Sequence, residues 1–167
     1  MVPPAWYDNS CSVGLDLRPV PCGRVGREIS IVTEPWYQDG LAFTCTRCGK
    51  CCTGEPGFVS VNDEEIQAIA EFRGQTVEEV CGLFTRSFQR GRSLREKLNG
   101  DCVFYDAEEG CTIYPVRPRQ CRTWPFWHSN LATPEAWERT KQACPGAGKG
   151  ELIPVEEITR RVRVIKL

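Results

Sequence analysis

Two stretches of the chain repeat apolar residues at every third or fourth position, which is the spacing of a helix with one buried face. The first stripe consists of Ile66, Ile69 and Ala70. The second stripe consists of Val77, Val80, Cys81, Phe84 and Phe88. We therefore predict two consecutive amphipathic helices, and we interpret Cys81 as a small apolar core residue on the buried face of the second.

Capping residues mark where both predicted helices begin and where the first one ends. Glu65 follows Asn62 by three residues, and Glu79 follows Thr76 by the same spacing, which is the capping-box pattern of a helix N-terminus. Gly74 lies where a C-terminal glycine ends the first helix. These residues place a helix boundary before residue 63, another at residue 74 and a third before residue 77.

Shorter apolar runs, separated by proline and glycine, predict the remaining elements. We expect extended segments at 27–34 and 58–61, and a hairpin whose strands at 102–105 and 111–114 are joined by a loop at 106–110. We also expect a solvated stretch at 89–100, a helical turn at 119–124, a helix from Thr133 that ends near Cys144, and a loop at 146–150. Beyond residue 155 we leave open a helix or a helix followed by a strand. Together these elements predict a small α+β domain.

Length and composition are those of an ordinary globular protein. The chain has 167 residues, of which 41% are hydrophobic and 26% charged, so we expect a single domain over residues 1–167. The net charge of −1 provides no general attraction to nucleic acid or to anionic lipid. No segment approaches the ~20 apolar residues of a membrane span. The sequence therefore indicates no clear nucleic-acid partner and no membrane partner.

Cysteine is the residue type in unusual abundance, with eleven in the chain. The N-terminal residues lack the basic and apolar regions of a secretory signal, so we expect a cytoplasmic protein with reduced cysteines. The odd count, and the adjacent Cys51 and Cys52, also fit a disulfide framework poorly. The cysteines are therefore expected to act as metal ligands or redox thiols.

The densest group of cysteines is the run Cys45-Thr46-Arg47-Cys48-Gly49-Lys50-Cys51-Cys52. Short Cys-x-x-Cys turns let a chain wrap a metal, and basic neighbours favour the thiolate form that binds it. Thiolates select zinc, copper(I) or iron–sulfur clusters over hard cations. Further candidate ligands lie at bends or element ends, at Cys102, Cys111, Cys121 and Cys144. Eight such ligands suit two tetrahedral zinc ions, or one or two iron centres.

The spacing of these cysteines is compatible with two metals. The turn Cys45-x-x-Cys48-Gly49 is similar to that of a zinc ribbon, but the chain lacks a clean second Cys-x-x-Cys. The run Cys45-x-x-Cys48-x-x-Cys51 with a remote Cys144-Pro145 is similar to a ferredoxin, but the fourth cysteine is not at the usual spacing. The residues alone leave open zinc and iron, including an iron–sulfur cluster.

Other side chains near the cysteines have ordinary interpretations. His128 is the only histidine and is distant in sequence from every cysteine, so we interpret it as a partly exposed loop residue. Trp124, Phe126 and Trp127 follow Cys121 and are expected to shield the site from water. For Arg119 and Arg122 the sequence leaves open hydrogen bonding to thiolates, binding of an anionic substrate, and surface ion pairing.

The cysteine pattern as a whole resembles the YkgJ family, a group of zinc- or iron-chelating domains. Its CxxCxxCC signature resembles Phe43-x-Cys45-x-x-Cys48-Gly49-x-Cys51-Cys52. Later pieces that agree are Gly100-Asp101-Cys102-Val103-Phe104, Cys111-Thr112-Ile113-Tyr114, Arg117-Pro118, Cys121-Arg122 and Cys144-Pro145-Gly146. The resemblance covers a metal-binding region at 43–150. It implies that the metal ligands are Cys45, Cys48, Cys51, Cys52, Cys102, Cys111, Cys121 and Cys144.

The resemblance leaves two classes of function open. The first is a metal-binding protein, in which zinc or iron either fixes the fold or is chelated for transfer. The second is an iron–sulfur enzyme of redox or group-transfer type, because the flagellin lysine N-methylases share the cysteine cluster and methylate protein lysines. The metal ion is the expected partner, and no protein partner is indicated.

Overall fold

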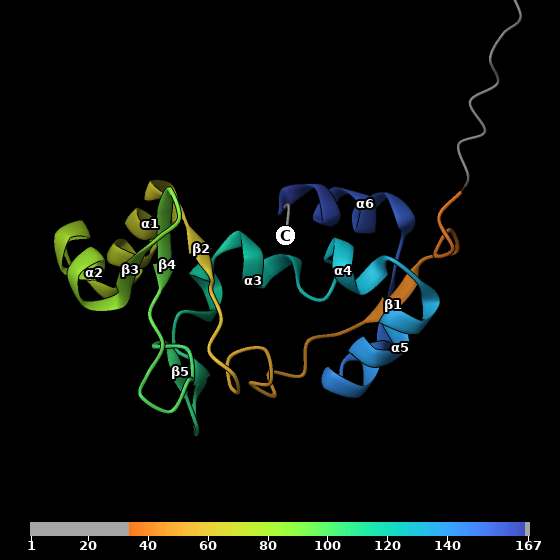
Figure 1. The fold of residues 1–167 in the computed structure, drawn as a ribbon, viewed down its shortest axis with the longest axis horizontal. Helices are drawn as coiled ribbons and strands as arrows, with labels where there is room; N and C mark the ends of the chain where they lie inside the picture. Colours follow the sequence, from red (N-terminus) through yellow and green to blue (C-terminus); the bar gives the residue numbers. More distant parts are fainter. Residues whose placement is uncertain (1–33, 166–167) are drawn as a thin grey trace, which may run out of the picture. The chain divides into compact units, whose positions relative to one another are not determined.

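The computed structural model of this chain describes residues 34–165. Figure 1 shows short helices and short strands along this part of the chain, which confirms the α+β class. The strand predicted at 27–34 falls outside the described residues except for Glu34, as do Cys11 and Cys22. None of the helices between residues 34 and 165 is long and apolar enough to cross a membrane.

The two predicted amphipathic helices are present as α1 (Asp63–Arg73) and α2 (Val77–Phe84). Both begin at the predicted capping boxes. In the first, the backbone N–H of Glu65 donates to Asn62 Oδ1 at 2.9 Å, and the Glu65 carboxylate accepts from the Asn62 N–H at 3.0 Å. Gly74 ends α1 with a left-handed φ of 63°, as its position predicts.

A three-stranded antiparallel sheet lies beside these helices (Figure 1). Its strands are β2 (Ser60–Val61), β3 (Thr85–Phe88) and β4 (Gly91–Leu94), in the order β2–β4–β3. The prediction that Phe88 belongs to the second helix is wrong. The chain becomes extended at Thr85, whose hydroxyl donates to the carbonyl of Cys81 at 2.7 Å, so Phe88 lies in β3.

The prediction of a solvated stretch at 89–100 is also wrong. This stretch contains β4, in which Ser93 and Leu94 are buried. The strand was not predicted because the arginines of this stretch do not alternate with apolar residues. Arg95, for example, donates to the carbonyls of Thr85 and Gly82 rather than only facing water.

The predicted hairpin is present, with strands that are shorter and shifted by a few residues. The strands β5 (Tyr105–Asp106) and β6 (Gly110–Cys111) pair antiparallel, and a 3-10 helix, η1 (Tyr114–Val116), follows. The predicted helical turn is α3 (Arg119–Thr123). These elements close the first hydrophobic core, whose buried residues are Val61, Ile66, Ile69, Ala70, Val80, Leu94, Phe104 and Ile113.

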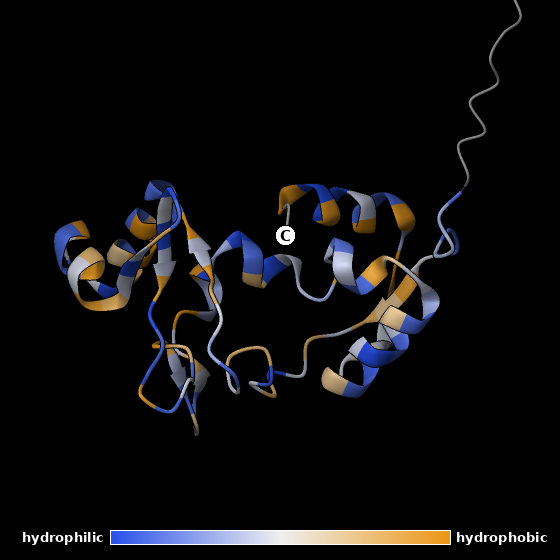
Figure 2. Cartoon of the chain, in the orientation of Figure 1, coloured by the Kyte–Doolittle hydropathy of each residue, from blue (hydrophilic) through white to orange (hydrophobic). Residues whose placement is uncertain are grey.

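A second core forms around the pair of strands β1 (Leu41–Phe43) and β7 (Ala147–Ile153). The helices α4 (His128–Leu131), α5 (Pro134–Ala143) and α6 (Val155–Val164) belong to this part of the fold. The helix predicted from Thr133 is confirmed, and the segment after residue 155 is helical. The buried residues of this core are Phe126, Leu131, Trp137, Cys144, Ala147, Ile153 and Ile158. Figure 2 shows hydrophilic and hydrophobic residues within each of these helices, as helices with one buried face require.

The prediction of a loop at 146–150 is wrong, because these residues begin β7 or adjoin it. The strand was not predicted because glycine is uncommon inside strands. Gly148 and Gly150 have left-handed φ values of 75° and 86°. The side chain of Thr44 occupies the space that a Cβ at Gly150 would need. The glycines therefore allow the end of β1 to approach this segment closely.

An irregular segment, residues 44–59, connects β1 of the second core to β2 of the first. We call it the cysteine loop, since Cys45, Cys48, Cys51 and Cys52 all lie in it. The helix α3 also contacts α6, so the two cores meet through few elements.

Candidate metal centre

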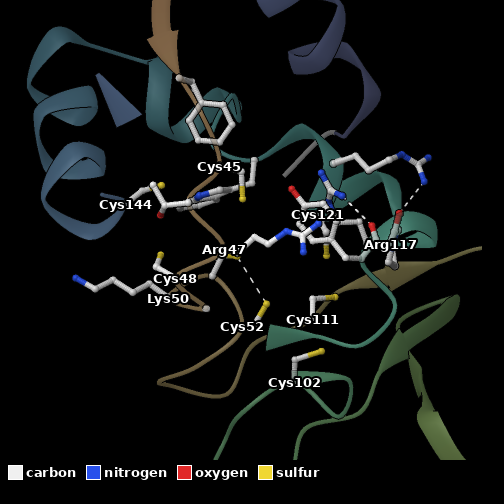
Figure 3. Close-up of a pocket in the computed structure, with 18 of the residues that line it drawn as sticks. Cys45, Arg47, Cys48, Lys50, Cys52, Cys102, Cys111, Arg117, Cys121 and Cys144 are labelled. Carbon is white, nitrogen blue, oxygen red and sulfur yellow. Dashed lines mark hydrogen bonds between the residues drawn. The ribbon is translucent and has the colours of Figure 1, made fainter. Parts of the chain in front are cut away.

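All eight cysteines predicted as ligands line one cavity of about 330 Å³. The cysteine loop supplies Cys45, Cys48, Cys51 and Cys52. The other parts of the fold supply Cys102, Cys111, Cys121 and Cys144. Figure 3 shows cysteine side chains from these separate segments around the same space. Cys81 lies outside the cavity and packs, partly buried, against the first core, as its interpretation predicts.

Cys45 and Cys144 are brought together by contacts between the end of β1 and the segment that follows α5. Cys144 is the C-terminal cap of α5 and is buried, whereas Cys45 and Cys48 are exposed. The backbone N–H of Thr44 donates to the carbonyl of Gly146 at 3.3 Å, and Thr44 Oγ1 accepts from the N–H of Glu151 at 3.1 Å. Thr44 was not among the predicted site residues, although the glycines at 146–150 were a local indication of close backbone approach.

The remaining cysteines gather around the hairpin. The backbone N–H of Cys102 donates to the carbonyl of Cys52 at 2.7 Å, which ties the cysteine loop to the segment before β5. Cys111 lies in β6 and Cys121 in α3. These four side chains are neither fully buried nor fully exposed.

The donor set fits a thiophilic metal. Eight thiols line the cavity and Glu151 is its only carboxylate, which is the chemistry that zinc and iron–sulfur centres use rather than that of calcium or magnesium. Cys51 Sγ and Cys52 Sγ are 3.7 Å apart. Within residues 34–165, however, no three Cys, His, Asp or Glu side chains converge closely enough to hold an ion. A bound ion would therefore need these side chains to rotate toward one another.

The thiols of the cavity have unequal acidity. A hydrogen bond with Cys52 lowers the pKa of Cys51 to about 7, and the nearby Arg117 contributes. The same hydrogen bond, followed by burial, raises the pKa of Cys52. Burial raises the pKa of Cys102 to about 11 and also raises the pKa of Cys111 and of Cys121. The lowered pKa makes the thiolate form of Cys51 more populated near neutral pH than that of Cys52 or Cys102.

A family model described as "CxxCxxCC: Putative zinc- or iron-chelating domain" matches residues 44–145, which is more than half of the chain. The chain belongs to the CxxCxxCC family. It is also 31% identical, over 91 residues, to an uncharacterized protein of Methanocaldococcus jannaschii. That match covers 54% of this chain and 48% of the relative, so the chain spans about half the length of the curated protein it matches. No solved structure matches the chain.

The region matched by the CxxCxxCC family contains all eight cavity cysteines. It also contains four cations that line the cavity, Arg47, Lys50, Arg117 and Arg122. None of them takes part in the ion pairs found among residues 34–165. Two divalent ions bound by eight thiolates have a net charge of about −4, which four cations would balance.

The arginines left open by the sequence have different roles. Arg119 pairs with Glu65 at 2.8 Å, so it is an ion-pair residue rather than a neighbour of the thiolates. Arg122 lines the cavity and donates to the carbonyl of Arg117. The guanidinium of Arg117 lies 3.8 Å from the centre of the Tyr114 ring. This cation–π contact was not predicted from the sequence.

The residues expected to shield the site differ in their positions. Trp124 lines the cavity, whereas Phe126 is fully buried in the second core. His128 is exposed as predicted, but it begins the short helix α4 rather than lying in a loop.

Gly49, within the CxxCxxCC signature, should not tolerate a side chain. It is buried with a left-handed φ of 75°, and a Cβ would overlap the ring of Tyr105. The variant Gly49→Ala should lose about 2–5 kcal/mol of unfolding free energy, from backbone strain and overpacking together. Urea unfolding monitored by circular dichroism measures this loss.

Gly57→Ala is the matched control, because no atom lies within 4 Å of its Cβ position and its φ is not left-handed. Equal stability of the two variants would show that the packing of Gly49 on Tyr105 is unimportant.

Proposed function

We propose that this chain is a metal-chelating domain that holds zinc or iron through the thiolates of its eight cavity cysteines. The observation that carries the proposal is that all eight line a single cavity, although they come from segments far apart in the sequence. Apolar packing alone would not explain why the thiols lie beside the cationic side chains of Arg47, Lys50, Arg117 and Arg122. The membership in the CxxCxxCC family supports the same chemistry.

The cavity's own residues supply what a thiolate site needs. The cations favour the deprotonated form of the cysteines, and the guanidinium of Arg117 is held in place by its stacking on Tyr114. The bound metal would cross-link the cysteine loop to both cores. Cys45, Cys48 and Cys51 are exposed, so ions can reach and leave the site from solvent, which favours a chelating role over a sealed structural one.

The test is the metal and acid-labile sulfide content of protein purified without oxygen, together with its visible absorbance. We expect about two zinc ions per chain in a colourless sample, or iron with a coloured absorbance spectrum. The variant Cys121→Ala should lose at least part of this metal, because its thiol lines the cavity.

Cys81→Ala is the matched control, since Cys81 lies outside the cavity, and it should retain the full metal content. Reduced protein that takes up neither zinc nor ferrous iron would overturn the proposed function.

A further inference from the structure

We propose that the eight cysteines form two metal sites that exchange their ions at different rates. The proposal rests on the proposed function and deepens it. One site, which we call the hairpin site, consists of Cys52, Cys102, Cys111 and Cys121. The other, which we call the loop site, consists of Cys45, Cys48, Cys51 and Cys144. The loop site is the one through which metal enters and leaves the protein.

The two sets of cysteines are held by different parts of the fold. Cys102 and Cys111 pack against the first core, whereas Cys144 is a buried member of the second. The Thr44 contacts hold Cys45 near the segment after Cys144. The backbone hydrogen bond from Cys102 to Cys52 instead places Cys52 with the hairpin. Each set therefore has its own scaffold.

The positions of the side chains show the same division. In the view of Figure 3, Cys45, Cys48 and Cys144 lie to one side of the cavity, and Cys52, Cys102, Cys111 and Cys121 lie to the other. A second cavity, of about 640 Å³, adjoins the first. Its lining contains Cys51 and three cysteines of the hairpin site, Cys52, Cys102 and Cys121, but none of Cys45, Cys48 and Cys144.

Cys51 is assigned by the number of ligands that each ion needs. Tetrahedral thiolate sites take four ligands, and the hairpin set already has four without Cys51. The other set has three, so Cys51 completes it. Its sulfur is 3.7 Å from that of Cys52, so the two sites adjoin at this pair of residues.

The difference in exchange follows from how the ligands are held. Three ligands of the loop site are exposed and lie in a segment without helix or strand, which opens at a low free-energy cost. The hairpin site takes only Cys52 from this segment, and its other ligands come from the backbone-paired Cys102, from β6 and from α3. An ion leaves only after several thiolates have dissociated, so the loop site should release its ion first.

The experiment measures the rate at which the zinc-loaded chain releases its ions. An excess of a chelating dye that changes absorbance when it binds zinc is added, and the signal is followed over time. We expect two phases of about one ion each, with rates that differ at least about tenfold. Cys48→Ala should abolish the fast phase alone, and Cys111→Ala the slow phase alone. Cys81→Ala, outside the cavity, should retain both phases.

A cadmium-113 NMR spectrum of the cadmium-loaded chain tests the proposal even if Cys111→Ala does not fold. Two resonances are expected. Cys45→Ala and Cys48→Ala, both at exposed positions, should lose the same one. Release of both ions in one phase, or loss of different resonances in these two variants, would overturn the division into sites. Failure of the chain to bind any metal would instead overturn the proposed function.

Discussion

Removal of the bound metal should lower the unfolding free energy of this chain by on the order of 10 kcal/mol, because an ion that binds the folded chain and not the unfolded one adds its binding energy to the stability of the fold. The fold makes this dependence strong. Two separate cores are each built from a small set of buried side chains, and the irregular cysteine loop connects them. Metal bound in the cavity would cross-link segments that otherwise meet through few elements.

The measurement is urea unfolding of the metal-loaded chain and of the same chain after treatment with chelator, both under reducing conditions. Trp124 lines the cavity, so tryptophan fluorescence should follow loss of structure there, and circular dichroism should follow the helices. Readdition of zinc to the chelator-treated sample should restore the midpoint. An unchanged midpoint after complete removal of metal would contradict this prediction, because it would show that the bound metal contributes nothing to the stability of the fold.

The helices of this fold could be predicted because their boundaries are encoded locally. The capping boxes at Asn62 and Thr76 need only residues three positions apart, and Thr133 caps α5 through a contact of the same range. The strand β7 could not be predicted, since pairing with the distant strand β1 defines it. The strand β4 forms a hairpin with the neighbouring β3, but its charged and polar residues do not show the alternation of a half-buried strand. In β7, Gly150 is a residue type that normally weakens a strand, but the approach of Thr44 leaves no room for a Cβ there.

The ligand set could be proposed from cysteine spacing, and the structure places all of it around one cavity. The division of these cysteines into a loop site and a hairpin site could not be proposed from the sequence, because it depends on which core holds each segment. Cys51 and Cys52 are adjacent in sequence, yet Cys51 is exposed, whereas Cys52 is partly buried and its carbonyl accepts the hydrogen bond from Cys102. The roles of Arg119 and Arg117 likewise depend on Glu65 and Tyr114, which the fold brings to them.

Metal binding at the hairpin cysteines should weaken steeply as the pH falls. Burial holds the pKa of Cys102 at about 11 and raises that of Cys111 and of Cys121, while the hydrogen bond with Cys51 raises that of Cys52. A raised pKa means that each thiol keeps its proton to a higher pH in the metal-free protein. Each proton must be displaced when an ion binds, so a lower pH favours the metal-free form.

The logarithm of the apparent binding constant for this ion should therefore rise by about four for each pH unit between about pH 6 and about pH 8. Competition against a chelator of known protonation measures this slope, and a pH indicator in weak buffer counts the protons directly. Cys102→Ala removes one thiol, so its slope should fall to about three, whereas Cys81→Ala should leave the slope unchanged. A slope near one for the unmodified chain would mean that a single protonated thiol takes part, which is incompatible with the four cysteines of the hairpin site sharing the ion.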